Sequence, residues 1–239
     1  MSLRDRIATP DGKRRFVRAI FTTIADRYDF ITVVLSYGQD RRWKRRLIAL
    51  AAPRPGGRAL DLATGTGDIA FALAERGARV VGLDITLRMI QLARDKAARG
   101  AQPGAAFLVG DMIALPFAAG AFDIVTTGYG LRNVPNLAAA IDEIGRVLSP
   151  GGQLLSLDFN RPSSRVVRAC YLAYLTLVGG ALGWALHRDA DTYRYIPASI
   201  RQYPGAEAVA RMFESRGFTG VRWYPILGGL MTIHHATRA

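Results

Sequence analysis

Cysteine and histidine are scarce in this sequence, which limits the chemistry that the chain can carry. Among 239 residues there is one cysteine, Cys170, and there are three histidines. A lone cysteine excludes an intrachain disulfide, and no Cys/His cluster has the spacing of zinc ligands. We therefore expect a reducing compartment and no structural metal. The opening MSLRDRIATPDGKRRF contains no apolar stretch of the kind found in secretory signals, which predicts a cytoplasmic protein.

Acidic residues are also in the minority. Lys and Arg number 32 against 19 Asp and Glu, a formal net charge of +13, and residues 1–58 hold 14 of the basic and 5 of the acidic residues. A basic face of this kind meets nucleic acid, anionic lipid or only solvent. The sequence has no internal repeat, low-complexity tract or basic stripe interleaved with aromatic residues, so we expect no nucleic-acid partner. A solvated face and a membrane surface both stay open.

Short apolar runs alternate with helix-period segments from residue 58 onward. This alternation is typical of βαβ units and a parallel sheet. The expected strands are 58–63, 79–84, 105–111, 122–129, 152–159, 220–225 and 230–237, and the expected helices are 69–76, 87–99, 137–148 and 206–216. The last two strands, separated by ILGG, predict an antiparallel hairpin. The fold class is therefore α/β: a Rossmann-like, doubly wound, seven-stranded mixed sheet with a C-terminal antiparallel hairpin.

Two further regions lie outside this pattern. Residues 1–57 carry basic helical segments at 13–25 and 40–51, which predict a helical lid on a core of residues 58–239. Residues 169–186, inside an expected helical insertion at about 163–200, form an 18-residue run without a charge. A membrane span takes about 20 apolar residues, and glycines interrupt this run. We expect a buried or lid helix rather than a span, or an apolar lid that contacts a lipid-soluble substrate.

A glycine loop follows the first expected strand in the stretch ALDLATGTGDIA. Glycines here allow positive φ and close backbone approach to a ligand, and the next helix presents unpaired N–H groups. The acid before the loop would repel a pyrophosphate and suits a cationic ligand, so it favours S-adenosylmethionine over a dinucleotide. The residues expected to border this cofactor are Asp61, Ala63, Thr64, Gly65, Thr66 and Gly67.

The next two strands also end in acids. Asp84, followed by Ile85, is placed to accept the ribose hydroxyls, and Asp111 is placed to take the adenine amino group while Met112 packs on the ring. One such aspartate alone is explained by a helix cap. Three at successive carboxyl ends of strands, where ligands of open α/β sheets bind, predict a site for S-adenosylmethionine.

Several stretches resemble the ubiquinone/menaquinone biosynthesis C-methyltransferase family, from about residue 16 to the end. The glycine loop and RVLSPGG are shared with many methyltransferases, whereas the combination of SYG...W, GLRN and YRYIPASI is narrow. The matching stretches are LDLATGTGD, LPF, YGLRNV, RYD, SYGQDRRWK, RVLSPGG, LDFNRP, YRYIPASIRQYP and RGFTG. Three positions depart from the family pattern: Thr32 replaces an asparagine, Gly128 replaces a small polar residue, and LDFNRP replaces LEFSxP.

The resemblance implies transfer of a methyl group from S-adenosylmethionine to a ring carbon of a polyprenylated quinol, without a metal. Demethylmenaquinol and a ubiquinol precursor are both implied as acceptors. In this interpretation Arg132 stabilises the phenolate, Asn133 positions the quinol or a water, and Tyr28 contacts the methyl donor or that water. Lys44 meets the cofactor carboxylate or lipid head groups, and Gly128 contacts the cofactor through its main chain.

Alternatives stay open at this point. In a purely structural interpretation, Asn133 caps a helix that starts near Pro135 and Arg132 pairs with a carboxylate on the lid. His234 and His235 are expected to be satisfied histidines rather than bases. Three other functions are compatible with the sequence: a methyltransferase that acts on another apolar small molecule, a non-catalytic subunit of a quinone-synthesis complex, and an RNA methyltransferase. We expect peripheral contact with an anionic membrane on its inner face, and a homodimer is one option for the assembly.

Overall fold

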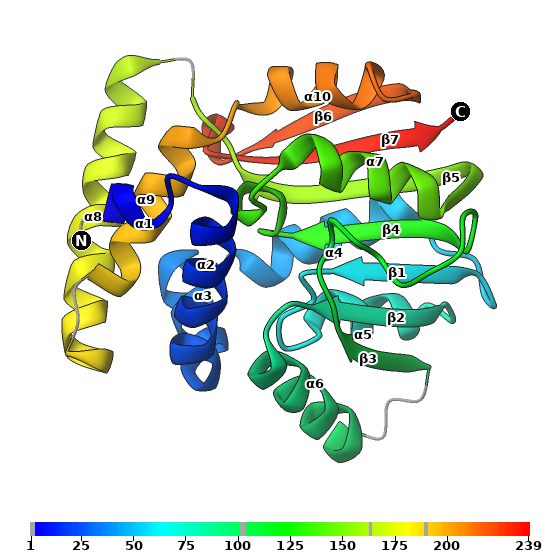
Figure 1. Ribbon diagram of the computed structural model, residues 1–239, viewed down its shortest axis with the longest axis horizontal. Helices are drawn as coiled ribbons and strands as arrows, with labels where there is room; N and C mark the ends of the chain where they lie inside the picture. Colours follow the sequence, from blue (N-terminus) through cyan, green and yellow to red (C-terminus); the bar gives the residue numbers. More distant parts are fainter. Residues whose placement is uncertain (1–2, 101–103, 163, 189–190) are drawn as a thin grey trace.

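The protein is a three-layered α/β structure built on one seven-stranded sheet (Figure 1). The computed structural model describes residues 3–100, 104–162, 164–188 and 191–239. The strand order is β3-β2-β1-β4-β5-β7-β6, with β7 antiparallel to both neighbours and the first five strands parallel. The strands are β1 (Arg58–Leu62), β2 (Arg79–Asp84), β3 (Ala105–Val109), β4 (Phe122–Gly128), β5 (Leu148–Phe159), β6 (Phe218–Ile226) and β7 (Met231–Arg238). The predicted mixed sheet and its C-terminal hairpin are confirmed.

Helices cover both faces of this sheet, which explains why its strands are apolar on both sides. One face packs on α4, α5 and α6 and the other on α7 and α10. In β1, for example, Ala59 belongs to the first layer while Leu60 and Leu62 belong to the second. The helices of the chain are α1 (Leu3–Arg6), α2 (Pro10–Ile24), α3 (Tyr28–Leu35), α4 (Asp40–Ala51), α5 (Asp68–Ala74), α6 (Leu87–Gly100), α7 (Leu137–Val147), α8 (Arg165–His187), α9 (Asp191–Gln202) and α10 (Ala206–Glu214), with 3-10 turns η1 (Ala25–Arg27), η2 (Leu131–Asn133) and η3 (Leu227–Gly229).

The boundary between α7 and β5 differs from the prediction. The helix ends at Val147, one residue before its expected end, and β5 already begins at Leu148, four residues before its expected start and ahead of Pro150 and the two glycines. Leu148 pairs with Phe122 and Gln153 with Ile124, so the register shifts between these pairs. Proline lacks an N–H and is accommodated where the ladder is irregular. The PGG stretch therefore forms a bulge inside the strand.

The N-terminal helices divide between two places. Helix α4 packs into the core of the sheet, where Leu47 and Ala51 have no exposed surface. Helices α2 and α3 instead form a separate apolar cluster with α9, made by residues such as Phe16, Ile31 and Tyr195. Figure 1 shows α2 and α3 beside the carboxyl ends of the parallel strands. These two helices, rather than α4, therefore lie where a lid would lie.

Helix α8 contains the charge-free run and is mostly exposed. It packs along α9 and stands at the side of the molecule in Figure 1. Within the described residues, its stretch Arg165–Leu186 is the one helix long and apolar enough to cross a membrane, and 22% of that stretch is buried. Leu177 is 73% and Trp184 71% exposed. The expectation of a buried helix is wrong, because only one side of α8 meets the rest of the protein.

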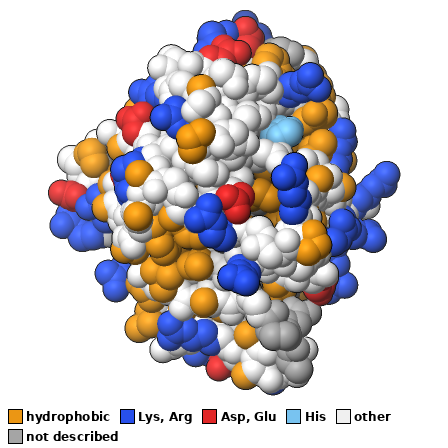
Figure 2. All heavy atoms as spheres, turned by 90° about the vertical axis from the view of Figure 1, so that its right-hand side faces the viewer, with side chains coloured by type: hydrophobic (Ala, Val, Ile, Leu, Met, Phe, Trp, Pro, Cys, Tyr) orange, Lys and Arg blue, Asp and Glu red, His pale blue; other side chains and the backbone are white. Residues whose placement is uncertain are grey.

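The opposite, amino-terminal edge of the sheet faces the viewer in Figure 2. Lys and Arg side chains lie there singly among uncharged ones and do not form a continuous stripe. Each of the two histidines of β7 has a polar partner at Nε2, whereas the buried Nδ1 of His234 has none among the described residues, so the expectation of satisfied histidines holds only in part. His234 is buried with Nε2 2.9 Å from the Ala206 carbonyl oxygen, and burial lowers its pKa to about 4. His235 Nε2 lies 2.9 Å from Gln153 Oε1.

Candidate functional site

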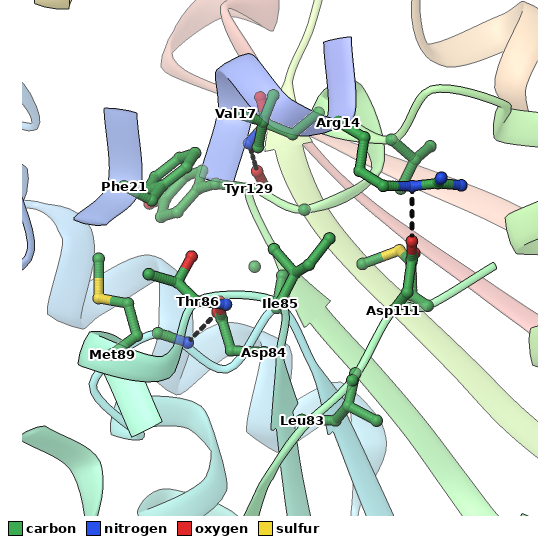
Figure 3. A pocket seen from close by; sticks show the side chains of 18 of the residues that line it. Arg14, Val17, Phe21, Leu83, Asp84, Ile85, Thr86, Met89, Asp111 and Tyr129 are labelled. Atoms are coloured by element: carbon green, nitrogen blue, oxygen red, sulfur yellow. Dashed lines mark hydrogen bonds and ion pairs between the residues drawn. The ribbon is translucent and has the colours of Figure 1, made fainter. Parts of the chain in front are cut away.

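The carboxyl ends of β1, β2 and β4, together with the loop after β3, border a cavity that α2 covers (Figure 3). Its volume is about 70 Å³. Predicted cofactor residues that line it are Ala63, Gly65, Asp84, Ile85, Asp111, Met112 and Gly128. Five others do not line it: Asp61, Thr64, Thr66, Gly67 and Lys44. The strand ends therefore bring together most of the predicted set, as parallel topology requires.

The glycine loop is held in shape by its threonines. Gly65 and Gly67 have φ of +55° and +92°, and a Cβ at Gly67 would lie 2.8 Å from the Phe71 ring. The Thr64 hydroxyl donates to Asp61 at 2.6 Å, and the Thr66 hydroxyl donates to Asp29 at 2.6 Å. The threonines therefore support the loop, and Gly65 is the part of it that faces the cavity.

Asp61 lies behind the loop rather than in the cavity. It is 1% exposed, and its two carboxylate oxygens accept the hydroxyls of Thr64 at 2.6 Å and Thr126 at 2.8 Å. Burial raises its pKa to about 6, although these hydrogen bonds oppose the change. Because both hydroxyls are fixed by the sheet and the loop, they hold the carboxylate away from the cavity. Asp61 thus ties the loop to β4 in this structure.

Asp84 and Asp111 lie at the cavity wall, as predicted. The Asp84 carboxylate accepts the backbone N–H of Gly65 at 3.0 Å and of Thr86 at 2.8 Å, and burial raises its pKa. Asp111 forms an ion pair with Arg14 of α2, with Nε 2.9 Å from Oδ2. Figure 3 shows Arg14 reaching from α2 to Asp111 across the cavity. Asp111, which is expected to bind the adenine, is therefore paired with a residue of α2.

The walls of this first cavity have the chemistry of a site for a nucleoside without phosphates. Two carboxylates and apolar side chains surround it, and Arg14, the lone Lys or Arg among its described lining residues, is already paired with Asp111. Small-molecule sites generally have about 300–1,000 Å³, more than this cavity offers with α2 in its present position. The partly exposed ion pair between Arg14 and Asp111 joins α2 to the cavity wall.

A second, larger cavity of about 510 Å³ adjoins the first. Its lining is apolar and aromatic and comes from α2, α3, α8, α9 and the segment Leu227–Met231, including Ile20, Ile24, Ile31, Val167, Tyr171, Tyr195 and Ile196. Phe21, Tyr28 and Tyr129 line both cavities. The face of α8 that meets the protein thus forms one wall of an apolar chamber, which agrees with the lid version of the prediction.

Arg132 and Asn133 lie where the two cavities meet. Arg132 lines the second cavity and Asn133 the first. The buried Arg132 guanidinium lies 3.1 Å from Asp158 Oδ1 through Nε and donates to Asn133 Oδ1 at 2.9 Å and Ser199 Oγ at 3.1 Å. Its carbon lies 4.7 Å from the Phe159 ring centroid. The carboxylate partner therefore comes from β5 and not from the lid.

The remaining structural alternative for Asn133 is wrong. Helix α7 is capped by Asn136, whose side chain accepts the backbone N–H of Ala139 at 3.1 Å. Asn133 instead donates to the Tyr129 carbonyl oxygen at 2.8 Å. Its amide is thus held at the junction of the cavities by the Arg132 side chain on one side and by the backbone on the other.

Tyr28 and Lys44 have different surroundings. Tyr28 is a wall of both cavities, and burial raises its pKa to about 12, so it is a neutral phenol at physiological pH. Lys44 lines neither cavity; its Nζ lies 2.6 Å from Asp40 and 2.9 Å from Asp68. A residue that binds the cofactor carboxylate is expected to line the cofactor cavity, and Lys44 does not.

Sequence reasoning missed Tyr129, Asp40 and Asp158. Asp158 ends β5 just as the predicted acids end their strands, so the same rule would have found it. Tyr129 has φ of +60°, which is uncommon outside glycine and directs its ring into both cavities. Within the described residues, no group of three His, Cys, Asp or Glu side chains is placed to hold a metal ion.

The sequence matches the model of the ubiE/COQ5 methyltransferase family over residues 9–238. The chain belongs to this family. It is 42% identical over 222 residues to a demethylmenaquinone methyltransferase of Thermus thermophilus, covering 92% of this chain and 100% of that one. It is 37% identical to a ubiquinone/menaquinone biosynthesis C-methyltransferase of Teredinibacter turnerae, covering 95% and 93%.

Solved structures agree on the fold of this methyltransferase. An S-adenosylmethionine-dependent methyltransferase of Aquifex aeolicus superposes with a TM-score of 0.60 at 14% identity, covering 82% of this chain and 89% of that chain. The first cavity, with a carboxylate ending β2, apolar walls and no free cation for a phosphate among its described lining residues, fits S-adenosylmethionine. This is the cofactor that the sequence predicted.

Asp84→Ala is expected to weaken binding of S-adenosylmethionine by about 1.5–3 kcal/mol, or on the order of 10- to 100-fold in Kd. The reason is the loss of a buried carboxylate that both faces the cavity and holds the Gly65 N–H. Calorimetric titration of the free enzyme measures this. The control is Asp123→Asn, which changes an exposed carboxylate paired with Arg58. An unchanged Kd for Asp84→Ala would remove Asp84 from the cofactor site.

Proposed function

We propose that this methyltransferase transfers a methyl group from S-adenosylmethionine to a ring carbon of a polyprenylated quinol, with demethylmenaquinol as acceptor. The observation that carries the proposal is the apolar chamber of about 510 Å³ next to the nucleoside cavity, with Arg132 at their junction. A quinol ring with an apolar tail matches this chamber in shape and polarity. The 42% identical relative is named for demethylmenaquinone, which favours that acceptor over a ubiquinol precursor.

The cofactor supplies an electrophilic methyl group carried on a sulfonium. In the proposal, Asp84 and Gly65 would hold its ribose, Ile85 and Met112 would border its adenine, and Gly128 would contact it through its main chain. A Cβ at Gly128 would lie 2.7 Å from Ile69 Cδ1, so glycine at this position allows α5 to pack closely on β4. The residue that departs from the family pattern thus lines the cavity with its main chain.

Arg132 is proposed to stabilise the negative charge that develops on the acceptor oxygen. Its guanidinium is fixed by Asp158, Asn133 and Ser199 before any substrate binds, so little reorganisation is needed when the charge forms. The aromatic and aliphatic walls exclude water, which strengthens this interaction. Asn133 holds its amide at the boundary of the two cavities, where ring carbon and methyl group must meet.

The protein is further proposed to work at the surface of an anionic membrane on the cytoplasmic side. The outward face of α8 exposes Leu177 and Trp184, while its other face lines the chamber. Arg165, Arg168 and Arg201 border a groove on the outward side of α8. Apolar side chains next to arginines are suited to the interface of a bilayer with anionic lipids. A tailed quinol then passes from the bilayer into the chamber along α8.

The function is tested by methyl transfer from labelled S-adenosylmethionine to reduced quinones. We expect product with demethylmenaquinol, less with a ubiquinol precursor, and none with a panel of non-quinone phenols and sterols. Incorporation of label at a ring carbon distinguishes C- from O-methylation. Activity on the panel without activity on either quinol would contradict the proposal.

Arg132→Ala is expected to lower kcat by at least about 100-fold while the Kd for S-adenosylmethionine changes less than about twofold. The guanidinium faces the second cavity and not the first, so its loss affects the acceptor side. Arg132→Lys is the matched variant, because it keeps the positive charge beside buried Asp158 and loses only the forked hydrogen bonds. Equal losses in kcat and cofactor affinity would show a structural role instead.

Leu177→Glu combined with Trp184→Glu is expected to lower binding to vesicles of phosphatidylglycerol and phosphatidylcholine by at least about tenfold. Both side chains are exposed, so folding is retained while apolar contact with the bilayer is lost. Co-sedimentation measures binding, and activity on a long-tailed quinol falls with it. Trp223→Glu, which adds a charge at an exposed tryptophan of β6, is the control. Unchanged binding and activity of the double variant would contradict the membrane proposal.

A further inference from the structure

A line of polar contacts leads from the junction of the two cavities to the protein surface. It begins at Tyr129, which borders both cavities and whose hydroxyl donates to Asp40 Oδ1 at 2.6 Å. Asp40 Oδ2 lies 2.6 Å from Lys44 Nζ, which in turn lies 2.9 Å from Asp68 Oδ2. Asp40 is 3% exposed, whereas the Asp68 side chain is 41% exposed. The contacts therefore extend from the junction of the cavities to a partly exposed carboxylate.

Methylation of a quinol ring releases one proton for each turnover, and a group of the site must take it up. The new carbon–methyl bond forms as the sulfur–methyl bond of the donor breaks, and the ring carbon loses its hydrogen as a proton. Electron density reaches that carbon when the neighbouring phenol gives up its own proton. A group within hydrogen-bond reach of the phenol must accept it.

The other buried groups near the junction are poorly suited to this task. Both Asp158 oxygens are engaged, Oδ1 by Arg132 Nε and the Phe159 N–H and Oδ2 by the Arg132 N–H. Tyr28 is a neutral phenol, since burial raises its pKa to about 12. Arg132 is a cation and has no acceptor atom. Asp40, a carboxylate reached through Tyr129, is an acceptor to which none of these objections applies.

We propose, on the basis of the function above, that the acceptor phenol passes its proton to the Tyr129 oxygen while the Tyr129 hydroxyl proton passes to Asp40. Tyr129 donates its one proton to Asp40, so the lone pairs of its oxygen stay available to accept another. Tyr129 is neutral before and after the transfer, and Asp40 gains the proton. Lys44 is a cation without an acceptor atom and holds Asp40 beside Asp68, so the proton leaves Asp40 by the reverse path, through the Tyr129 hydroxyl to water, once the product has left the site.

Charged and titratable groups face Asp40 from three neighbouring segments as well as its own helix. Lys44 lies on α4 itself, Tyr28 on α3, Tyr129 after β4 and Asp68 at the start of α5. The Lys44 ammonium and the Tyr129 hydroxyl each contact one oxygen of the Asp40 carboxyl group.

The test compares Asp40→Asn and Tyr129→Phe with wild-type enzyme, using the quinol that the wild type methylates. Asn keeps an oxygen that accepts the Tyr129 hydroxyl, and Phe keeps the ring, so both changes are close in shape. We expect kcat to fall by about 10²- to 10⁴-fold, with KM and the Kd for S-adenosylmethionine within about twofold of wild type. In both variants kcat should rise with pH as hydroxide replaces the lost acceptor, whereas the wild-type profile stays flat around neutral pH.

Two further measurements separate proton transfer from a structural role. In Asp40→Ala, added formate should restore kcat in a concentration-dependent way, because it supplies a carboxylate in the space left by the side chain. The controls are Asp123→Asn on the surface and Tyr203→Phe, a buried tyrosine that lines neither cavity. Both should keep wild-type kcat and pH profile.

Failure of this inference is distinguishable from failure of the proposed function. If the wild type methylates a quinol but Asp40→Asn keeps its kcat and flat pH profile, the proton route is wrong and the function stands. Loss of kcat together with cofactor affinity or melting temperature, with no change in pH profile and no rescue by formate, also overturns it. Wild-type inactivity on every quinol contradicts the function, and with it this route.

Discussion

The buried ion pair between Arg132 and Asp158 is the interaction on which the site depends. Side chains 5% and 1% exposed carry opposite charges between η2 and β5. Desolvating two such charges costs several kcal/mol for each ion, and the pair is stable only because further hydrogen bonds satisfy them. Asn133 and Ser199 supply these bonds to the guanidinium, and the backbone N–H groups of Arg132 and Phe159 supply them to the carboxylate.

The same segment also anchors the helix that covers the first cavity. Lys13 of α2 donates to the carbonyl oxygens of Arg132 at 3.0 Å and Val134 at 2.8 Å. Burial and the nearby Arg132 charge lower the Lys13 pKa to about 8. The position of α2 over the nucleoside cavity, and the position of Arg132 in the apolar chamber, are thus set by one short turn.

The pattern of apolar and acidic residues along the chain was enough to predict the sheet and most of the residues at its carboxyl edge. Apolar runs buried on both faces must be strands of a covered parallel sheet, and acids at their ends must gather at one edge. Asp84 and Asp111 lie there as expected. Asp61 is at the same edge, but its carboxylate accepts hydrogen bonds from Thr64 of the loop and Thr126 of β4. Packing decides which of several nearby polar groups form hydrogen bonds with one another. The spacing of residues along the chain does not reveal these partners.

The sequence by itself determined the fold, the edge of the sheet where ligands bind and the family, since these depend on periodicity and on motifs that are local in the chain. Tertiary structure alone decided the exposure of α8, the pairing of Arg132 with β5, and the contact between Tyr129 and Asp40, which lie 89 positions apart. Each of these requires elements distant in sequence to meet, and their meeting depends on how helices pack on the sheet. The chamber between α3 and α8 exists for the same reason, because neither helix encloses it without the other.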